Sequence, residues 1–190
     1  MTDALDTLIL GIGNVLWADE GFGVRCIEAL NERYEFKPGV RLMDGGTQGI
    51  FLLPWVRSAE RLLIFDAIDF GLPPGSLRLI RDGDVPRYMG AKKVSMHQTG
   101  FQEVLASAGL ISGNPERLAL IGVQPEVLDD YGGGLRPLVR NCIPDALTLA
   151  CGVLEEWGID LRQRTVPPGS PDLTGPVAVA LEHYEKRRLH

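Results

Sequence analysis

The sequence contains no long uninterrupted apolar run and few cysteines. No run is long enough to span a bilayer, and Asp3 and Asp6 stand where a signal peptide would carry basic residues. We therefore expect a cytoplasmic protein with no membrane partner. The three cysteines, Cys26, Cys142 and Cys151, form no Cys-x-x-Cys pair, so we predict that they are reduced residues of the core.

Two catalytic motifs and an excess of basic residues are also missing. The chain has no Gly-x-Ser-x-Gly sequence and no His-Glu-x-x-His helix, which argues against standard serine hydrolases and thermolysin-like proteases. It has 19 Lys and Arg against 25 Asp and Glu, a formal net charge of −6. Because a nucleic-acid surface needs clustered basic residues, we expect no nucleic-acid partner.

The length of 190 residues suits one domain with a full core, and no internal repeat is present. Beyond Ile159 the composition shifts to a segment rich in Pro and Gly, and the chain ends in basic residues. We therefore predict an α/β domain over residues 1–160. Residues 161–190 are predicted to be a C-terminal extension, formed by a linker and a marginal helix.

Apolar runs alternate with amphipathic segments along the predicted domain. Strands are expected at residues 8–12, 40–44, 61–69, 76–80 and 117–123. Helices are expected after Glu20 and at residues 50–56, 97–110 and 135–157. The short connection before residue 76 favours an antiparallel edge strand. The pattern predicts a three-layer α/β fold, with a mostly parallel twisted sheet of about five strands and helices on both faces.

The first strand leads into a glycine-rich turn and then into the acid pair Asp19-Glu20. Acids at a helix start often act only as caps. The turn is also similar to a dinucleotide-binding loop, but Leu16 stands where the third glycine is needed, and acids follow where a pyrophosphate needs positive potential. Nucleotide binding is therefore disfavoured. The remaining interpretation is an active-site edge, where α/β enzymes hold their chemistry.

Polar side chains from separate segments are predicted to meet at this edge. They are the acid pair, Asp66 at the end of the third long strand, and His97 at the start of a later helix. Two carboxylates and an imidazole suit nickel, zinc or manganese. Other roles remain open, because Asp66 can bond loop amides, His97 can bond Ser95, and Asp44 before two glycines is often a turn former.

Five motifs in order resemble those of the hydrogenase maturation endopeptidases. They are Leu10-Gly11-Ile12-Gly13-Asn14 running to Asp19-Glu20-Gly21-x-Gly23-Val24-Arg25, then Asp44-Gly45-Gly46-Thr47-x-Gly49, Phe65-Asp66-Ala67, His97-Gln98-x-Gly100, and Ile121-Gly122-Val123-Gln124-Pro125-Glu126. The resemblance covers roughly residues 8–159. It implies an endopeptidase that removes a C-terminal extension from the large-subunit precursor of nickel-iron hydrogenase after nickel insertion.

The resemblance also implies roles for individual residues. Glu20, Asp66 and His97 are the implied metal ligands and catalytic residues, and Asp44 is implied to affect processing specificity. The metal is expected to be the precursor's nickel, for which zinc or cadmium would substitute in vitro. Asp19 is then left as a helix cap or as a support for a ligand. We expect a monomer, because no exposed apolar stripe stands out.

Two other functions stay open on the sequence. A nickel carrier that binds the precursor without cutting it would use the same ligands. A nucleotide-binding protein of the Rossmann type would need its missing glycine compensated elsewhere. Loss of a peptide from the precursor distinguishes the peptidase from the carrier, and thermal protection by nucleotide would reveal the third class.

Overall fold

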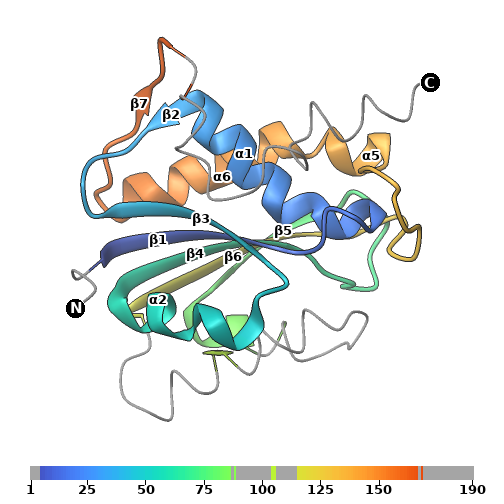
Figure 1. The fold of residues 1–190 in the computed structure, drawn as a ribbon, viewed down its shortest axis with the longest axis horizontal. Helices are drawn as coiled ribbons and strands as arrows, with labels where there is room; N and C mark the ends of the chain where they lie inside the picture. Colours follow the sequence, from blue (N-terminus) through green and yellow to red (C-terminus); the bar gives the residue numbers. More distant parts are fainter. Residues whose placement is uncertain (1–4, 87, 89–103, 106–114, 167, 169–190) are drawn as a thin grey trace.

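The computed structural model describes residues 5–86, 88, 104–105, 115–166 and 168. A five-stranded sheet in the order β3-β1-β4-β6-β5 forms its centre (Figure 1). The strands are β1 (Leu5–Ile12), β3 (Val40–Gly46), β4 (Ala59–Ala67), β5 (Leu77–Arg81) and β6 (Arg117–Val123). Only the edge strand β5 runs antiparallel to its neighbour among these pairs. The prediction of a mostly parallel sheet with an antiparallel edge strand is confirmed.

Helices pack on both faces of this sheet. They are α1 (Phe22–Arg33), α2 (Leu53–Ser58), α5 (Pro137–Arg140) and α6 (Ile143–Glu156), with short 3-10 turns η1 (Ala18–Gly21), η2 (Gly49–Leu52) and η3 (Asp82–Asp84). Figure 1 shows α1 and α6 on one face and α2 on the other. The predicted three-layer arrangement is therefore confirmed.

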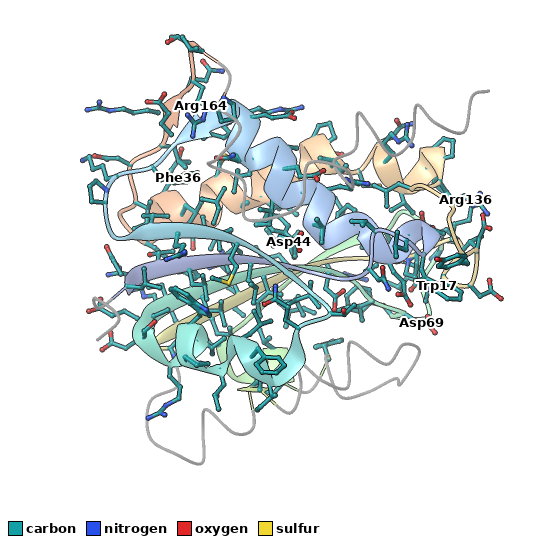
Figure 2. All side chains as sticks on the ribbon, in the orientation of Figure 1. Trp17, Phe36, Asp44, Asp69, Arg136 and Arg164 are labelled. Carbon is teal, nitrogen blue, oxygen red and sulfur yellow. The ribbon has the colours of Figure 1, made fainter. Side chains whose placement is uncertain are left out.

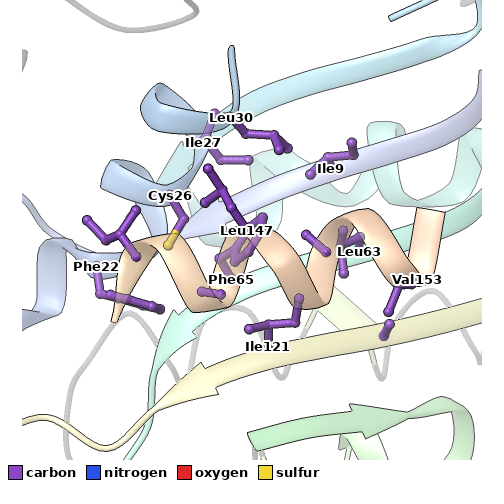
Figure 3. Close-up of a cluster of buried hydrophobic side chains, with 14 of the residues drawn as sticks. Ile9, Phe22, Cys26, Ile27, Leu30, Leu63, Phe65, Ile121, Leu147 and Val153 are labelled. Atoms are coloured by element: carbon purple, nitrogen blue, oxygen red, sulfur yellow. The ribbon is translucent and has the colours of Figure 1, made fainter. Parts of the chain in front are cut away.

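Two hydrophobic clusters hold the layers together, one on each face of the sheet. The first contains Ile9, Phe65 and Ile121 from the strands, packed against α1 and α6 (Figure 3). The second contains Ile64 together with residues of α2 and the helical pair Val104–Leu105. Successive strand residues point to opposite faces, so an apolar run such as that of β4 supplies both clusters.

Two helices differ from the sequence-based expectation. The predicted closing helix is broken between α5 and α6, because Pro144 lies in the first turn of α6 and cannot continue the hydrogen bonding of a preceding helix. Helix α1 buries its apolar stripe as predicted, but it also buries two polar residues, Arg25 at 3% exposure and Asn31 at 7%. The polar face expected at those positions is thus partly inside the protein.

A small second sheet joins the end of the described chain to α1. Strands β2 (Tyr34–Glu35) and β7 (Arg162–Gln163) pair antiparallel. Arg164 reinforces this pairing, since its side chain donates hydrogen bonds to the carbonyl oxygens of Asn31 and Tyr34 at 2.7 and 3.0 Å. The first residues of the segment predicted as an extension therefore pack on the domain, and residues 169–190 lie outside the described part.

Cys26 is buried in the first cluster, Cys142 and Cys151 are half-buried, and none of them forms a disulfide. Within the described residues, every helix is too short or too polar to cross a membrane.

Candidate functional site

Close packing at two glycines brings the start of α1 over the ends of β1 and β4. A Cβ atom built on Gly23 would lie 2.3 Å from the carbonyl oxygens of both Ile12 and Phe65. One built on Gly13 would lie 1.8 Å from the carbonyl oxygen of Glu20, and Gly13 has a φ of 134°. These glycines therefore serve the approach of helix to strand. The same approach brings Glu20 to the sheet edge at which β4 ends with Asp66 and Ala67.

Glu20 lies in η1, which packs against β4, and only 9% of its surface is exposed. Its N–H donates to the carbonyl of Trp17 at 2.9 Å, and its carbonyl accepts from Asn14 at 3.1 Å. The preceding Ala18 has a φ of 38°, a left-handed conformation, and its N–H donates to Gly133 at 2.9 Å. The backbone that carries Glu20 is thus held on both sides.

Asp66 is fully buried at the carboxyl end of β4. Its Oδ1 accepts a hydrogen bond from the N–H of Ala67 at 2.8 Å. The sequence left open that Asp66 bonds a nearby backbone amide, and this bond is of that kind. Leu62 and Ile64 belong to the cluster on the α2 face. By strand alternation Asp66 is on that same face.

Asp44 stands at the same edge but on the other face of the sheet. It pairs in register with Gly11, and Leu42, two residues earlier, packs against the cluster under α1. Figure 2 shows Asp44 on the α1 side. Burial raises the pKa of Asp44, while a hydrogen bond from the Gly46 N–H and the charge of Arg25 act in the opposite direction. The structure thus brings Glu20 and Asp66 to the same end of the sheet, and it places Asp44 on the face opposite to that of Asp66.

The third predicted ligand, His97, lies outside the described residues. Within the described part of the chain, no group of three or more His, Cys, Asp and Glu side chains is arranged to hold a metal ion. The predicted metal set therefore stays a prediction, of which the structure places Glu20 and Asp66.

Asp19 has a different role from the cap that its position suggests. Its side chain is fully buried, and within the described residues its hydrogen bonds go to another loop and not to the helix that follows Glu20. Oδ2 accepts from the N–H groups of Glu126 and Val127 at 2.8 and 2.9 Å, and Oδ1 accepts from that of Arg136 at 2.8 Å. The capping interpretation is wrong, and Asp19 supports the loop that carries Glu20.

Gln124 is a second loop anchor, a role that its position in the sequence does not predict. Its Oε1 accepts from the N–H groups of Phe70 and Leu72 at 2.7 and 3.1 Å, and its Nε2 donates to Asp69 at 3.1 Å. The available signal was a polar residue directly after the buried strand β6. Gln124 therefore fixes the loop that follows Asp66.

An aromatic contact lies at the same end of the sheet. Trp17 and Tyr131 form an isolated antiparallel bridge, and their rings meet edge to face with centroids 5.2 Å apart. Figure 2 shows Trp17, Asp69 and Arg136 gathered at one end of the sheet. Loops from distant parts of the chain thus meet at the end of the sheet where β4 ends with Asp66 and Ala67.

Residues 24–153 match the hydrogenase maturation protease family. The chain belongs to this family. The hydrogenase expression/formation protein HoxM of Azotobacter vinelandii is 55% identical over 185 residues, which cover 97% of this chain and 88% of that protein. The hydrogenase 2 maturation protease of Escherichia coli K12 is 39% identical over 158 residues, covering 83% and 95%.

The solved structures agree with this membership. The hydrogenase maturating endopeptidase HybD from E. coli superposes with a TM-score of 0.80 at 38% identity, covering 85% of this chain and 99% of HybD. The predicted resemblance to the family and the predicted α/β fold are confirmed. A member of the hydrogenase maturation protease family is a hydrolase that cuts a peptide bond, so the predicted enzyme class is confirmed as well.

Proposed function

We propose that this protease removes the C-terminal extension of a nickel-iron hydrogenase large-subunit precursor after nickel insertion. In this proposal Glu20, Asp66 and His97 recognise the nickel of the precursor, so the metal belongs to the substrate. The observation that carries the proposal is the placement of two nearly buried carboxylates at one sheet edge, in a chain of this family. Ligands are supplied in such folds by the loops at the carboxyl ends of the strands.

The chemistry of these three side chains explains why cleavage would require nickel in the precursor. Carboxylate and imidazole ligands suit borderline divalent metals such as nickel. A nickel ion held jointly by the precursor and by these side chains would fix the cleavage point beside Glu20 and Asp66. As a Lewis acid at this position, nickel would polarise the scissile carbonyl or lower the pKa of a bound water. A carboxylate at the edge then serves as the acceptor for the proton of the attacking water.

Asp44 is proposed to act in recognition of the precursor. Its side chain is on the α1 face, and Asp66 is on the α2 face, which supports separate roles for the two carboxylates. The residues that follow Asp44 form a turn in which Gly46 and Gly49 have φ of 44° and 52°. This turn exposes Phe51 at 77% of its surface. A protease committed to one cleavage needs such contacts beyond the scissile bond.

The test compares nickel-loaded and nickel-free precursor as substrates of the full chain. Intact-mass measurement is expected to show loss of a C-terminal peptide only from the loaded precursor. Equal cleavage of both would refute recognition of nickel, although a peptidase activity would remain. Tight binding of the loaded precursor without loss of mass would instead identify a nickel carrier.

A further inference from the structure

An ion pair on α1 between the buried Arg25 and the partly buried Glu28 has no part in the function described so far. The side chain of Arg25 is 2% exposed, and its Nη1 donates to both carboxylate oxygens of Glu28 at 2.9 Å. Burial of a guanidinium costs free energy unless its charge and its donors are matched. Arg25 lies five residues after Glu20, so this cost is incurred next to the candidate site.

The backbone places Asp44 beside this ion pair. A Cβ atom built on Gly11 would lie 2.4 Å from the carbonyl oxygen of Gly23 and 2.7 Å from Cγ1 of Ile27, so this turn of α1 lies directly over Gly11. Asp44 is the register partner of Gly11 on the neighbouring strand, and it is on the α1 face. Asp44 therefore lies next to the helical turn that carries Arg25.

The electrostatic effects agree with this placement. Arg25 lowers the pKa of Asp44 against the larger, raising effect of burial. The pKa of Glu28 is raised by burial first, is lowered by Arg25, and is raised further by the charge of Asp44. The guanidinium of Arg25 thus contacts the Glu28 carboxylate and also acts through its charge on the Asp44 carboxylate of a neighbouring strand.

The pairing between β1 and β3 becomes irregular directly after Asp44. The register changes from Gly11 opposite Asp44 to Ile12 opposite Gly46, so Gly45 is an extra residue in the ladder. Such bulges end regular pairing and re-aim the neighbouring side chain. At this bulge the Asp44 carboxylate accepts a hydrogen bond from the Gly46 N–H and experiences the charge of Arg25.

We propose that Arg25 is a positioning residue that holds the Asp44 carboxylate against α1, with Glu28 fixing the guanidinium, and so determines how well the precursor binds. This inference rests on the proposed role of Asp44 in precursor recognition. Without the guanidinium, the carboxylates of Asp44 and Glu28 repel each other. Asp44 then turns toward solvent, and the turn that follows it moves with it.

A double-mutant cycle tests the proposal with the nickel-loaded precursor as substrate. Arg25→Lys and Asp44→Asn are each expected to raise KM about tenfold with kcat within about twofold. The double variant is expected to be no worse than Asp44→Asn alone, because Arg25 acts through Asp44. Arg33→Lys, an exposed arginine on the same helix, is the control and should leave both constants unchanged. A multiplicative loss in the double variant, or a fall in kcat with unchanged KM, would overturn the proposal.

A second measurement requires no substrate. The Gly46 N–H donates to the Asp44 carboxylate, so its amide resonance in the NMR spectrum reports the position of that carboxylate. The resonance is expected to shift in Arg25→Lys and in Glu28→Gln, and to stay in place in Arg33→Lys. An unchanged Gly46 resonance in Glu28→Gln would overturn the proposal even if Arg25→Lys failed to fold. If the wild type did not cut the precursor, the proposed function would fail, while this measurement would still judge the link between Arg25 and Asp44.

Discussion

The Asp19 carboxylate and the backbone of Arg136 are joined by a 2.8 Å hydrogen bond across 117 positions of sequence. The other carboxylate oxygen accepts from Glu126 and Val127. One fully buried side chain therefore ties the loop that carries Glu20 to the loop that follows β6. Because the acceptor is charged, each of these bonds is stronger than a bond between neutral groups.

Replacement of Asp19 by Asn should destabilise the protein. The amide group would present an NH₂ to backbone N–H donors on one side, which leaves at least one buried donor without an acceptor. We expect a loss of about 1–3 kcal/mol in the free energy of unfolding, measured by urea denaturation. Asp129→Asn, at an exposed position of the same loop, is the matched control and should change little. Equal stability of the two variants would contradict the role given to Asp19.

Gly23→Ala should destabilise the protein through contact with two strands. A Cβ atom at Gly23 meets backbone oxygens at 2.3 Å, which cannot move without displacing β1 or β4. Overpacking of this kind costs about 1–3 kcal/mol. Gly152 lies in the middle of α6 with nothing within 4 Å of a built Cβ, so Gly152→Ala should instead stabilise by up to about 1 kcal/mol. Thermal unfolding of both variants should move in opposite directions, and parallel shifts would refute this account.

Much of the fold could be predicted from the sequence because its signals are local. The run Leu8 to Ile12 and the run before Asp66 are apolar on both faces, which is typical of interior strands of a parallel sheet, and both are interior. The short turn before β5 predicted its antiparallel direction. The break between α5 and α6 was missed because the apolar pattern continues through Cys142, although Pro144 marks the start of a new helix.

The candidate site could be predicted only as far as topology determines it. Glu20 follows the parallel strand β1 and Asp66 lies at the carboxyl end of the parallel strand β4, so their placement at the same end of the sheet follows from the order of elements. The partners of Asp19 lie more than a hundred positions away and are backbone groups, for which the sequence has no signal. Arg25 has a polar position on an amphipathic helix, and its burial depends on Glu28 and on the neighbouring strand.

The difference in stability between Asp44→Asn and wild type should grow as the pH rises. Burial raises the pKa of Asp44 above its ordinary value, so the folded state binds this proton more tightly than the unfolded chain. Its contribution to stability is therefore present below the unfolded pKa and lost as pH rises through the folded pKa. We expect Asp44→Asn to gain stability relative to wild type at about pH 7 and to lose that gain at about pH 3, measured by melting temperature.

Asp160 is an internal control, because its pKa is shifted in the direction opposite to that of Asp44. The hydrogen bond and the charge of Lys37 lower the pKa of Asp160, so its contribution is present above the unfolded pKa and lost as pH falls. Asp160→Asn should therefore lower the melting temperature at about pH 7, by an amount that shrinks as the pH falls toward about 3, with a small change throughout because the pair is exposed. The same pH trend in both variants would contradict the assignment for Asp44.

Asp66→Asn should separate metal recognition from folding. The asparagine keeps a side-chain oxygen that can accept from the N–H of Ala67, so the end of β4 should keep its structure. The variant loses the negative charge that a divalent cation requires. We expect binding of cadmium or zinc, used as probes in calorimetry, to weaken at least about tenfold, and processing of the nickel-loaded precursor to fall at least as much. Glu126→Gln, an exposed acid on the neighbouring loop, should retain both properties. Processing at the wild-type rate by Asp66→Asn would show that Asp66 is no ligand of the precursor's nickel, whereas lost processing with retained metal binding would assign it to the cleavage step.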